Sequence, residues 1–193
     1  MDKERGKHMQ ILRPDEFSCD PLTHHIELEE ESSPYLNSDV LNPAYFQSVV
    51  KKSHDLVDAL FEEGDPILLV YHVYGSPFQP TYLSRFIRNR EARYNTTLTQ
   101  TALGEEAVWT ATVPIPDKKQ LRLHSLLEAI CHQDFHFTPR LCRRCGTCPS
   151  VQLIHRTKGY VLFIYDDRGA YIRGTSIEQL QAIQQKISSS FMP

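Results

Sequence analysis

The chain contains 193 residues, of which 21 are lysine or arginine and 24 are aspartate or glutamate, so its formal net charge is −3. Hydrophobic residues make up 40% and charged residues 23%, which is close to the average of globular proteins and excludes a wholly disordered chain, a collagen or a coiled-coil rod. The acidic balance argues against nucleic acid as a partner, because nucleic-acid-binding domains usually carry an excess of basic residues.

The sequence favours a cytoplasmic protein. No apolar run approaches the roughly 20 residues that span a bilayer, so no association with a membrane is expected. The first residues lack the apolar stretch of a secretory signal. Four of the five cysteines lie within residues 131–148, and clustered cysteines in the cytosol are more typical of metal binding or buried thiols than of disulfides.

Residues 1–34 are predicted to be a flexible polar tail, followed by a single α+β domain over residues 35–193. The few apolar residues of this tail show no sustained helical or strand period. The tail also contains an acidic run, Glu27, Glu29, Glu30 and Glu31. Because acidic runs of this kind are usually solvated segments, we expect the tail to be exposed to solvent.

The first strong signals are a helix and a buried strand. Asn42 can cap a helix, and Pro43 suits its first position, where the missing N–H has no partner to lose. Apolar residues then recur at three- and four-residue steps, which predicts a helix over residues 43–63. The run from Pro66 to Tyr74 is almost continuously apolar, as expected of a strand that is buried on both faces.

The middle of the chain predicts two helices and two strands. Pro80 can open a helix that reaches about Arg90. The Thr-rich residues 94–101 predict an edge strand, and residues 107–113 alternate in the manner of a strand. A further helix is expected after the capping signal at Asp117.

The last third of the chain predicts three short strands and a closing helix. Apolar stretches at residues 151–156, 160–165 and 170–173 are separated by turns too short for a parallel crossover, so we expect an antiparallel meander. A capping box at Thr175 begins the helix. The predicted class is therefore α+β, with an antiparallel or mixed sheet that includes this C-terminal three-stranded meander, and with helices packed mainly on one face.

Cysteines and histidines between residues 131 and 155 form a candidate metal site. Cys142 and Cys145 have the two-residue gap of a zinc knuckle, in which both thiolates face one tetrahedral site. The expected ligands are Cys142, Cys145, Cys148 and His136, with His132, Cys131 and His155 as substitutes. The chain is accordingly expected to carry either no cofactor or one zinc ion. The alternatives are a loop of unliganded thiols and a redox-sensitive group activated by nearby arginines.

Asp166, Asp167 and Arg168 are candidate binding residues. Paired carboxylates can divide acid and base roles when their environments differ. Adjacent residues at a strand end point to opposite faces, however, so one carboxylate is expected to face away from a shared substrate. Because Asp is also a favoured turn residue, a structural role is preferred for the pair. Arg168 is expected to pair with a neighbouring carboxylate or an anionic ligand, and no residue is assigned as catalytic.

The stretch Leu162-Phe-Ile-Tyr-Asp-Asp-Arg-Gly169 resembles the C-terminal signature of a bacterial domain-of-unknown-function family of small cytosolic proteins. Residues 59–61 near the end of the first predicted helix and the strand over residues 67–71 are similar to that family as well. The chain departs from the family's pattern at the cysteine-rich residues 142–148 and at its C-terminal end. The resemblance implies a cytosolic bacterial protein, and it brings no assigned activity.

The leading hypothesis is a non-catalytic cytosolic protein that binds another protein, as a regulatory or immunity-type partner. The first alternative is a structural zinc-binding protein organised by residues 131–155. The second is an enzyme that uses Asp166 or Asp167. Nucleic acid is not an expected partner, because a solvated face is the more common role of clustered arginines. Four of them crowd the second predicted helix and its exit, namely Arg85, Arg88, Arg90 and Arg93.

Overall fold

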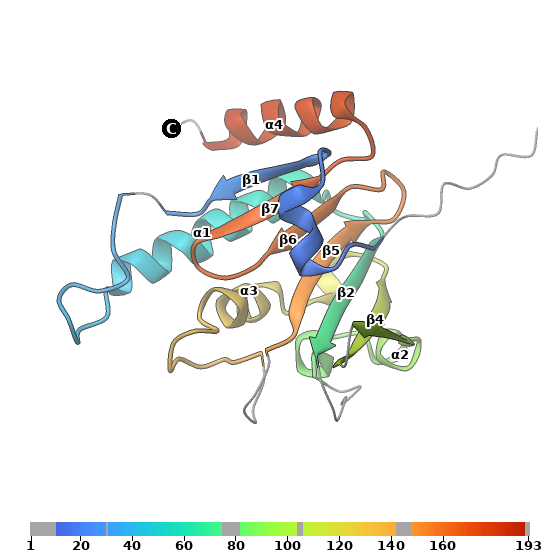
Figure 1. Ribbon diagram of the computed structural model, residues 1–193, viewed down its shortest axis with the longest axis horizontal. Helices are drawn as coiled ribbons and strands as arrows, with labels where there is room; N and C mark the ends of the chain where they lie inside the picture. Colours follow the sequence, from blue (N-terminus) through green and yellow to red (C-terminus); the bar gives the residue numbers. More distant parts are fainter. Residues whose placement is uncertain (1–10, 30, 75–81, 104–105, 142–147, 192–193) are drawn as a thin grey trace, which may run out of the picture.

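The chain forms a seven-stranded antiparallel sheet with helices against it, as the computed structural model shows (Figure 1), and the α+β class is confirmed. The structure describes residues 11–29, 31–74, 82–103, 106–141 and 148–191. The strands lie in the order β1-β7-β6-β5-β2-β4-β3. They are β1 Thr23–Glu27, β2 Ile67–Tyr74, β3 Thr97–Leu103, β4 Glu106–Ile115, β5 Ser150–His155, β6 Val161–Ile164 and β7 Gly169–Arg173.

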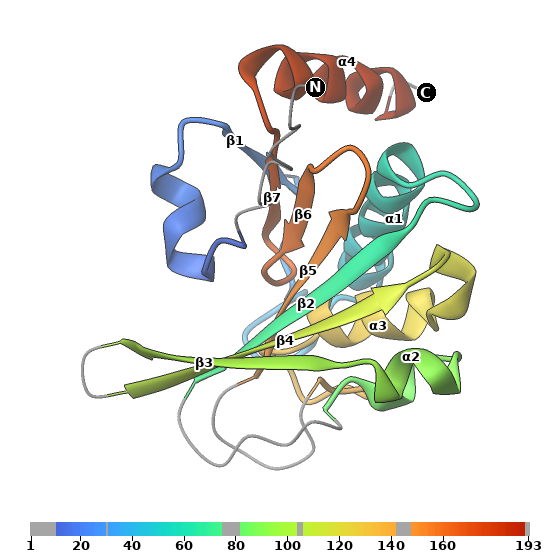
Figure 2. The same cartoon turned by 90° about the vertical axis from the view of Figure 1, so that its right-hand side faces the viewer.

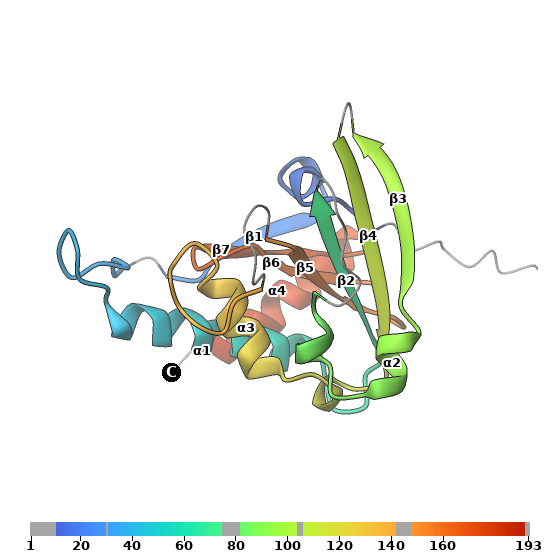
Figure 3. The same cartoon turned by 90° about the horizontal axis from the view of Figure 1, so that it is seen from below.

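Three longer helices lie on one side of the sheet, whereas a short 3-10 helix, η1, lies on the other (Figure 3). The α-helices are α1 Pro43–Leu60, α2 Arg90–Tyr94, α3 Leu123–Cys131 and α4 Ile177–Phe191. The 3-10 helices are η1 Pro14–Cys19, η2 Ser84–Phe86 and η3 Lys118–Gln120. Within the described residues, no helix has the length and apolar character needed to cross a bilayer.

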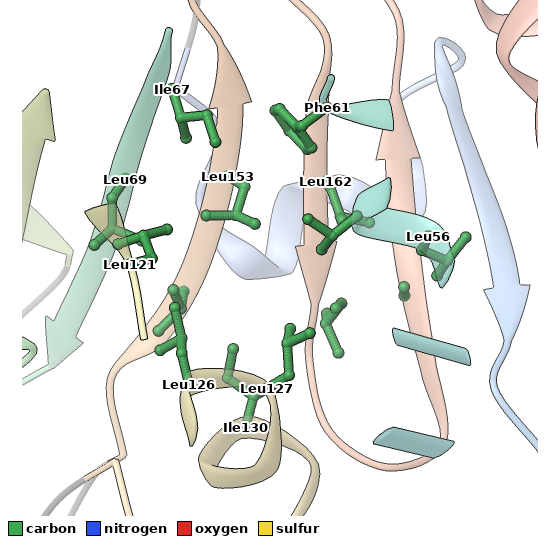
Figure 4. Packing of buried hydrophobic residues seen from close by; sticks show 14 of the residues in the cluster. Leu56, Phe61, Ile67, Leu69, Leu121, Leu126, Leu127, Ile130, Leu153 and Leu162 are labelled. Carbon is green, nitrogen blue, oxygen red and sulfur yellow. The ribbon is translucent and has the colours of Figure 1, made fainter. Parts of the chain in front are cut away.

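The larger core lies between the sheet and the helices α1, α3 and α4. Leu126, Leu127 and Ile130 of α3 point toward the sheet, where they meet Leu153 and Leu162 (Figure 4). Full burial of an aliphatic side chain of this size contributes about 1.5–3 kcal/mol. Burial in this core explains why apolar residues recur at helical spacing along α3 and why the strands that face the helices are apolar.

Helix α1 begins at the predicted residue. The side chain of Asn42 accepts hydrogen bonds from the backbone N–H groups of Ala44 and Tyr45, and Pro43 occupies the first helical position. These bonds satisfy two of the four donors that a helix N-terminus leaves without a partner. The helix ends at Leu60, slightly before the predicted residue 63.

The predicted helix from Pro80 to Arg90 is wrong over the residues that the structure describes. The chain instead forms η2, an isolated bridge between Ile87 and Leu121, and then α2. The backbone N–H of Arg88 donates to the Gln120 carbonyl at 2.7 Å, and such a bond to a distant segment replaces the bond that a helix would make. The four arginines of this region therefore do not share one helical face.

Residues 11–29 belong to the fold, so the prediction of a flexible tail over residues 1–34 is wrong for this part of the chain. β1 pairs with β7 and forms one edge of the sheet. η1 covers the sheet face opposite the main helices, with Phe17 almost completely buried. The residues of η1 and β1 show no sustained apolar period in the sequence, which is why the pattern did not reveal them.

Candidate functional site

The turn between β6 and β7 gathers three carboxylates. β6 ends at Ile164, so Asp166 and Asp167 lie in the turn and not on the strand. One carboxylate oxygen from each of Asp134, Asp166 and Asp167 lies within 4.8 Å of the other two. The expectation that the adjacent carboxylates face apart is therefore wrong, because it assumed strand geometry at both residues.

Asp166 and Asp167 are buried, and each has its own hydrogen-bond partner. The hydroxyl of Tyr45, on α1, donates to Asp167 Oδ2 at 2.7 Å. The backbone N–H of Arg168 donates to Asp166 Oδ1 at 2.7 Å, and its guanidinium donates to Asp166 Oδ2, with Nε at 2.8 Å. The structure thus brings the three predicted binding residues together, with the Arg168 side chain exposed to solvent.

Burial has the largest effect on the pKa values of Asp167 and Tyr45. It raises the pKa of Asp167, and the hydrogen bond from Tyr45 acts in the opposite direction. Burial and the Asp167 carboxylate together raise the pKa of Tyr45, which keeps its hydroxyl a donor. Carboxylate oxygens are ligands that Mg²⁺ and Ca²⁺ accept, but Arg168 already supplies the positive charge at Asp166. The contacts therefore support a structural role, in which the turn is tied to α1.

Tyr45→Phe is expected to lower the free energy of unfolding by about 1–3 kcal/mol, because it leaves a buried oxygen of Asp167 without its donor. Asp167→Ala is expected to have a similar effect, and the double variant less than the sum, because both changes remove the same contact. Chemical denaturation measures all three. Tyr94→Phe is the control, since that side chain is 87% exposed, and it should be neutral. Additive effects of the first two changes would contradict the contact.

The predicted zinc ligands do not form a cluster within the part of the chain that the structure describes. Cys142 and Cys145 lie outside the described residues. Cys148 and His136 are exposed, and His136 Nδ1 lies 2.9 Å from a guanidinium nitrogen of Arg140. His155 occupies the opposite end of β5 from Cys148, where its Nε2 lies 3.1 Å from a carboxylate oxygen of Asp65. The zinc hypothesis accordingly stays a prediction.

Cys131 and His132 face different surroundings at the end of α3. Cys131 is completely buried, and its sulfur lies 3.4 Å from the hydroxyl of Ser53. Burial raises the pKa of the Cys131 thiol to about 12, and a neutral thiol is a poor ligand because metals bind the thiolate. The ring of His132 packs edge-on against Phe46, with the ring centroids 5.2 Å apart. Burial lowers the pKa of His132.

In the folded protein, iodoacetamide is expected to modify the exposed Cys19 and Cys148 and to leave Cys131 unmodified, because only thiolates that reach solvent react. Mass spectrometry of a digest locates the alkylated residues. The same reaction in guanidinium chloride is the control and should modify all three. Native modification of Cys131 at the rate of Cys148 would contradict the buried position.

A groove of about 480 Å³ lies between α1 and α3. His54 Nε2 lies 3.1 Å from His124 Nδ1, and His124 Nε2 lies 3.4 Å from Glu128 Oε1. The sequence did not reveal this pair, because 70 positions separate the two histidines. The signal that could have pointed to the site is the four-residue spacing of His124 and Glu128, which places both side chains on one face of α3. The lining of the groove includes Phe46, Val50, His54, His124, Glu128 and His132.

Strand β3 forms the second edge of the sheet, in a long ribbon with β4 (Figure 2). Residues 97–102 are all exposed, including Leu98 at 38%. The inner edge of β3 pairs with β4, and no described strand pairs with its outer edge. Its sequence, Thr-Leu-Thr-Gln-Thr-Ala-Leu, contains no charged residue. The predicted edge strand is confirmed, and its outer edge is the candidate surface for binding a protein.

Comparison with known proteins gives a family and a distant relative. Residues 10–192 match the family described as "Domain of unknown function (DUF3885)". The "Uncharacterized protein YnaE" of Bacillus subtilis (strain 168) is 24% identical over 200 residues, which cover 95% of this chain and 92% of that protein. No solved structure matches the chain. These findings support the expected relationship to a bacterial family without an assigned function.

Proposed function

We propose, on the premise that this chain belongs to the DUF3885 family of domains of unknown function, that it binds another protein by accepting an extended segment at the outer edge of β3. One observation carries the proposal: this edge consists of seven uncharged residues, most of them exposed, with no described strand beside it. In strand addition, main-chain hydrogen bonds to such an edge give affinity, and alternate side chains give specificity.

β1 and β3 form the two edges of the sheet, and β1 is a protected edge whereas β3 is not. Native proteins usually protect an edge strand by keeping it short, charged or covered. β1 follows that rule, since it has five residues, includes Glu27 and contacts η1. β3 is longer and has no charged residue. An uncharged edge of this length either pairs with other copies and aggregates or is covered by a partner strand. We propose that a partner protein covers the outer edge of β3.

The side chains of β3 indicate which segment fits it. Leu98 and Ala102 lie on one face and Thr99 and Thr101 on the other, because successive side chains of a strand alternate. A partner strand with small apolar and β-branched residues complements both faces, and each cross-strand pair contributes about 0.2–1 kcal/mol. Binding of this kind suits a regulatory or immunity-type protein in the cytoplasm, which acts by occupying its target.

The other two hypotheses receive less support. An enzymatic role for Asp166 and Asp167 would need carboxylate oxygens that are available to a substrate, whereas Arg168 and Tyr45 already bind them. The zinc hypothesis depends on Cys142 and Cys145, which lie outside the described residues. Protein binding at the outer edge of β3 is therefore the function that the described residues support best.

The test compares the proteins that the wild-type chain and its edge variants capture from a lysate of the native host. Leu98→Lys and Gln100→Lys place a charge on the edge and are expected to abolish capture of the partner. Both side chains are exposed, so the unfolding temperature should not change. Gln181→Lys, on the exposed face of α4, is the matched control and should retain the partner. A partner that binds the edge variants as well as it binds the wild type would contradict the proposal.

A further inference from the structure

We propose that His54 and His124 bind a late transition-metal dication, such as Zn²⁺ or Ni²⁺, in the groove between α1 and α3. Imidazole nitrogen is a favoured ligand of these ions. The ring nitrogens from the two helices already lie 3.1 Å apart. Two nitrogens bound to one tetrahedral zinc ion at its usual bond length are separated by about 3.3 Å. The spacing of the two nitrogens therefore fits one ion, provided that the rings turn so that both lone pairs point at it.

Glu128 determines which nitrogen of His124 can bind the metal. A carboxylate only accepts hydrogen bonds, so the hydrogen of the neutral His124 ring lies on Nε2, which is 3.4 Å from Glu128 Oε1. The other nitrogen, Nδ1, then presents its lone pair toward His54 Nε2. Metal-bound histidines usually donate their second N–H to a carboxylate, which orients the ring and raises its basicity. Glu128 is therefore a positioning residue of the proposed site.

The two rings lie nearly parallel, with an angle of 24° between their planes and 5.3 Å between their centroids. Because the facing nitrogens are 3.1 Å apart, the rings meet edge to edge at these two atoms. Both rings must therefore turn for their lone pairs to converge on one ion.

Glu128 is the acidic residue that lines the groove, and Lys51 is a basic residue that lines it as well. The charge of Lys51 is paired with Asp55 at 3.3 Å, and Asp58, near His54, is paired with Lys118 at 2.6 Å. Glu128 faces His124 instead. The side chain of His124 is 67% exposed, so water or a small ligand can reach the remaining coordination positions. The structure thus provides two protein ligands, one orienting carboxylate and open positions.

Calorimetric titration of the full chain with Ni²⁺ alone, on protein without a histidine tag, tests the site. One ion per chain is expected to bind, and His54→Ala and His124→Ala should each abolish binding. Glu128→Gln should weaken it about tenfold, the lower end of the loss that follows removal of an orienting partner. His136→Ala is the control, because that exposed histidine lies outside the groove lining.

The cysteines require a separate variant, because they are ligands of the same ions. The triple change Cys142→Ser, Cys145→Ser and Cys148→Ser is expected to leave nickel binding intact. Ni²⁺ should also raise the unfolding temperature of the wild type and not that of the two histidine variants, which gives a second readout. The proposal would be overturned by wild-type protein that binds no nickel, by binding that survives both histidine changes, or by binding that the triple change abolishes.

Discussion

Phe17→Ala is expected to lower the free energy of unfolding by about 3–5 kcal/mol, the range for loss of a buried phenylalanine ring. Phe17 is 1% exposed, and its ring centroid lies 5.0 Å from that of Phe163 and 6.0 Å from that of Tyr171. Removal of the ring leaves a cavity beneath η1, on the sheet face opposite the main helices. A loss of this size would show that residues 11–29 are part of the cooperative fold.

The matched control lies in the same 3-10 helix. Asp15 is exposed, and its contact with Arg13 is a surface ion pair at 3.6 Å. Asp15→Ala should therefore change the free energy by no more than about 0.5 kcal/mol. Urea denaturation followed by circular dichroism measures both variants. If Phe17→Ala costs no more than the Asp15 variant, η1 does not hold its place on the sheet.

Acidification is expected to destabilise the fold by up to about 3 kcal/mol through His72 alone. His72 is 1% exposed, and burial lowers its pKa from 6.5 to about 4. The folded chain therefore favours the neutral ring, whereas the unfolded chain takes up a proton near pH 6.5. The contribution is fully present above pH 6.5, decreases as the pH falls, and is lost near pH 4, where the folded ring is protonated as well.

Burial is the main reason why the His72 ring resists protonation, and the backbone carbonyl of Leu12 acts in the opposite direction. Gln152 determines which ring nitrogen accepts a hydrogen bond. The amide nitrogen of Gln152 donates to the backbone carbonyl of Leu12 at 2.8 Å, which determines the orientation of the amide. The same nitrogen lies 3.1 Å from His72 Nε2, so that ring nitrogen accepts, while Nδ1 donates to the Thr110 hydroxyl at 3.0 Å. A second proton, on Nε2 of His72, would point at the amide N–H donor of Gln152. This network also joins the sheet to the N-terminal segment.

Unfolding free energies measured between pH 7 and pH 4 test this role of His72. His72→Gln introduces a side chain that does not titrate, and it is expected to flatten the pH dependence of stability in this interval. His136→Gln removes an exposed histidine and should keep the wild-type dependence. Equal pH dependence in the wild type and in His72→Gln would contradict the assignment.

The elements that could be predicted from the sequence are those with a local signal. α1 has a capping Asn42, a proline at its first position and a long apolar stripe, so its start was predicted correctly. β2 was predicted from its continuous apolar run. Both of its faces are apolar because the main core covers one face and the smaller cluster around Phe17 of η1 covers the other. β3 was predicted as an edge from its Thr-rich sequence. These signals act within one element and need no knowledge of its neighbours.

The features that could not be predicted depend on contacts between distant segments. η1 and β1 are held by pairing with β7 and by the apolar face beneath Phe17, and neither contact leaves a period in the sequence. The convergence of the carboxylates depends on where β6 ends and on Tyr45 from α1. The histidine pair depends on how α1 packs against α3. In each case the tertiary contact, and not local propensity, determines the arrangement.

Photo-crosslinking from residue 100 tests protein binding at the β3 edge most directly. Benzoylphenylalanine in place of the exposed Gln100 is expected to give a covalent adduct with one defined protein in cells of the native host, joined through an extended segment of that protein. The same group at the exposed Gln181 of α4 should give no such adduct. Absence of an adduct from residue 100, or equal adducts from both positions, would contradict protein binding at this edge.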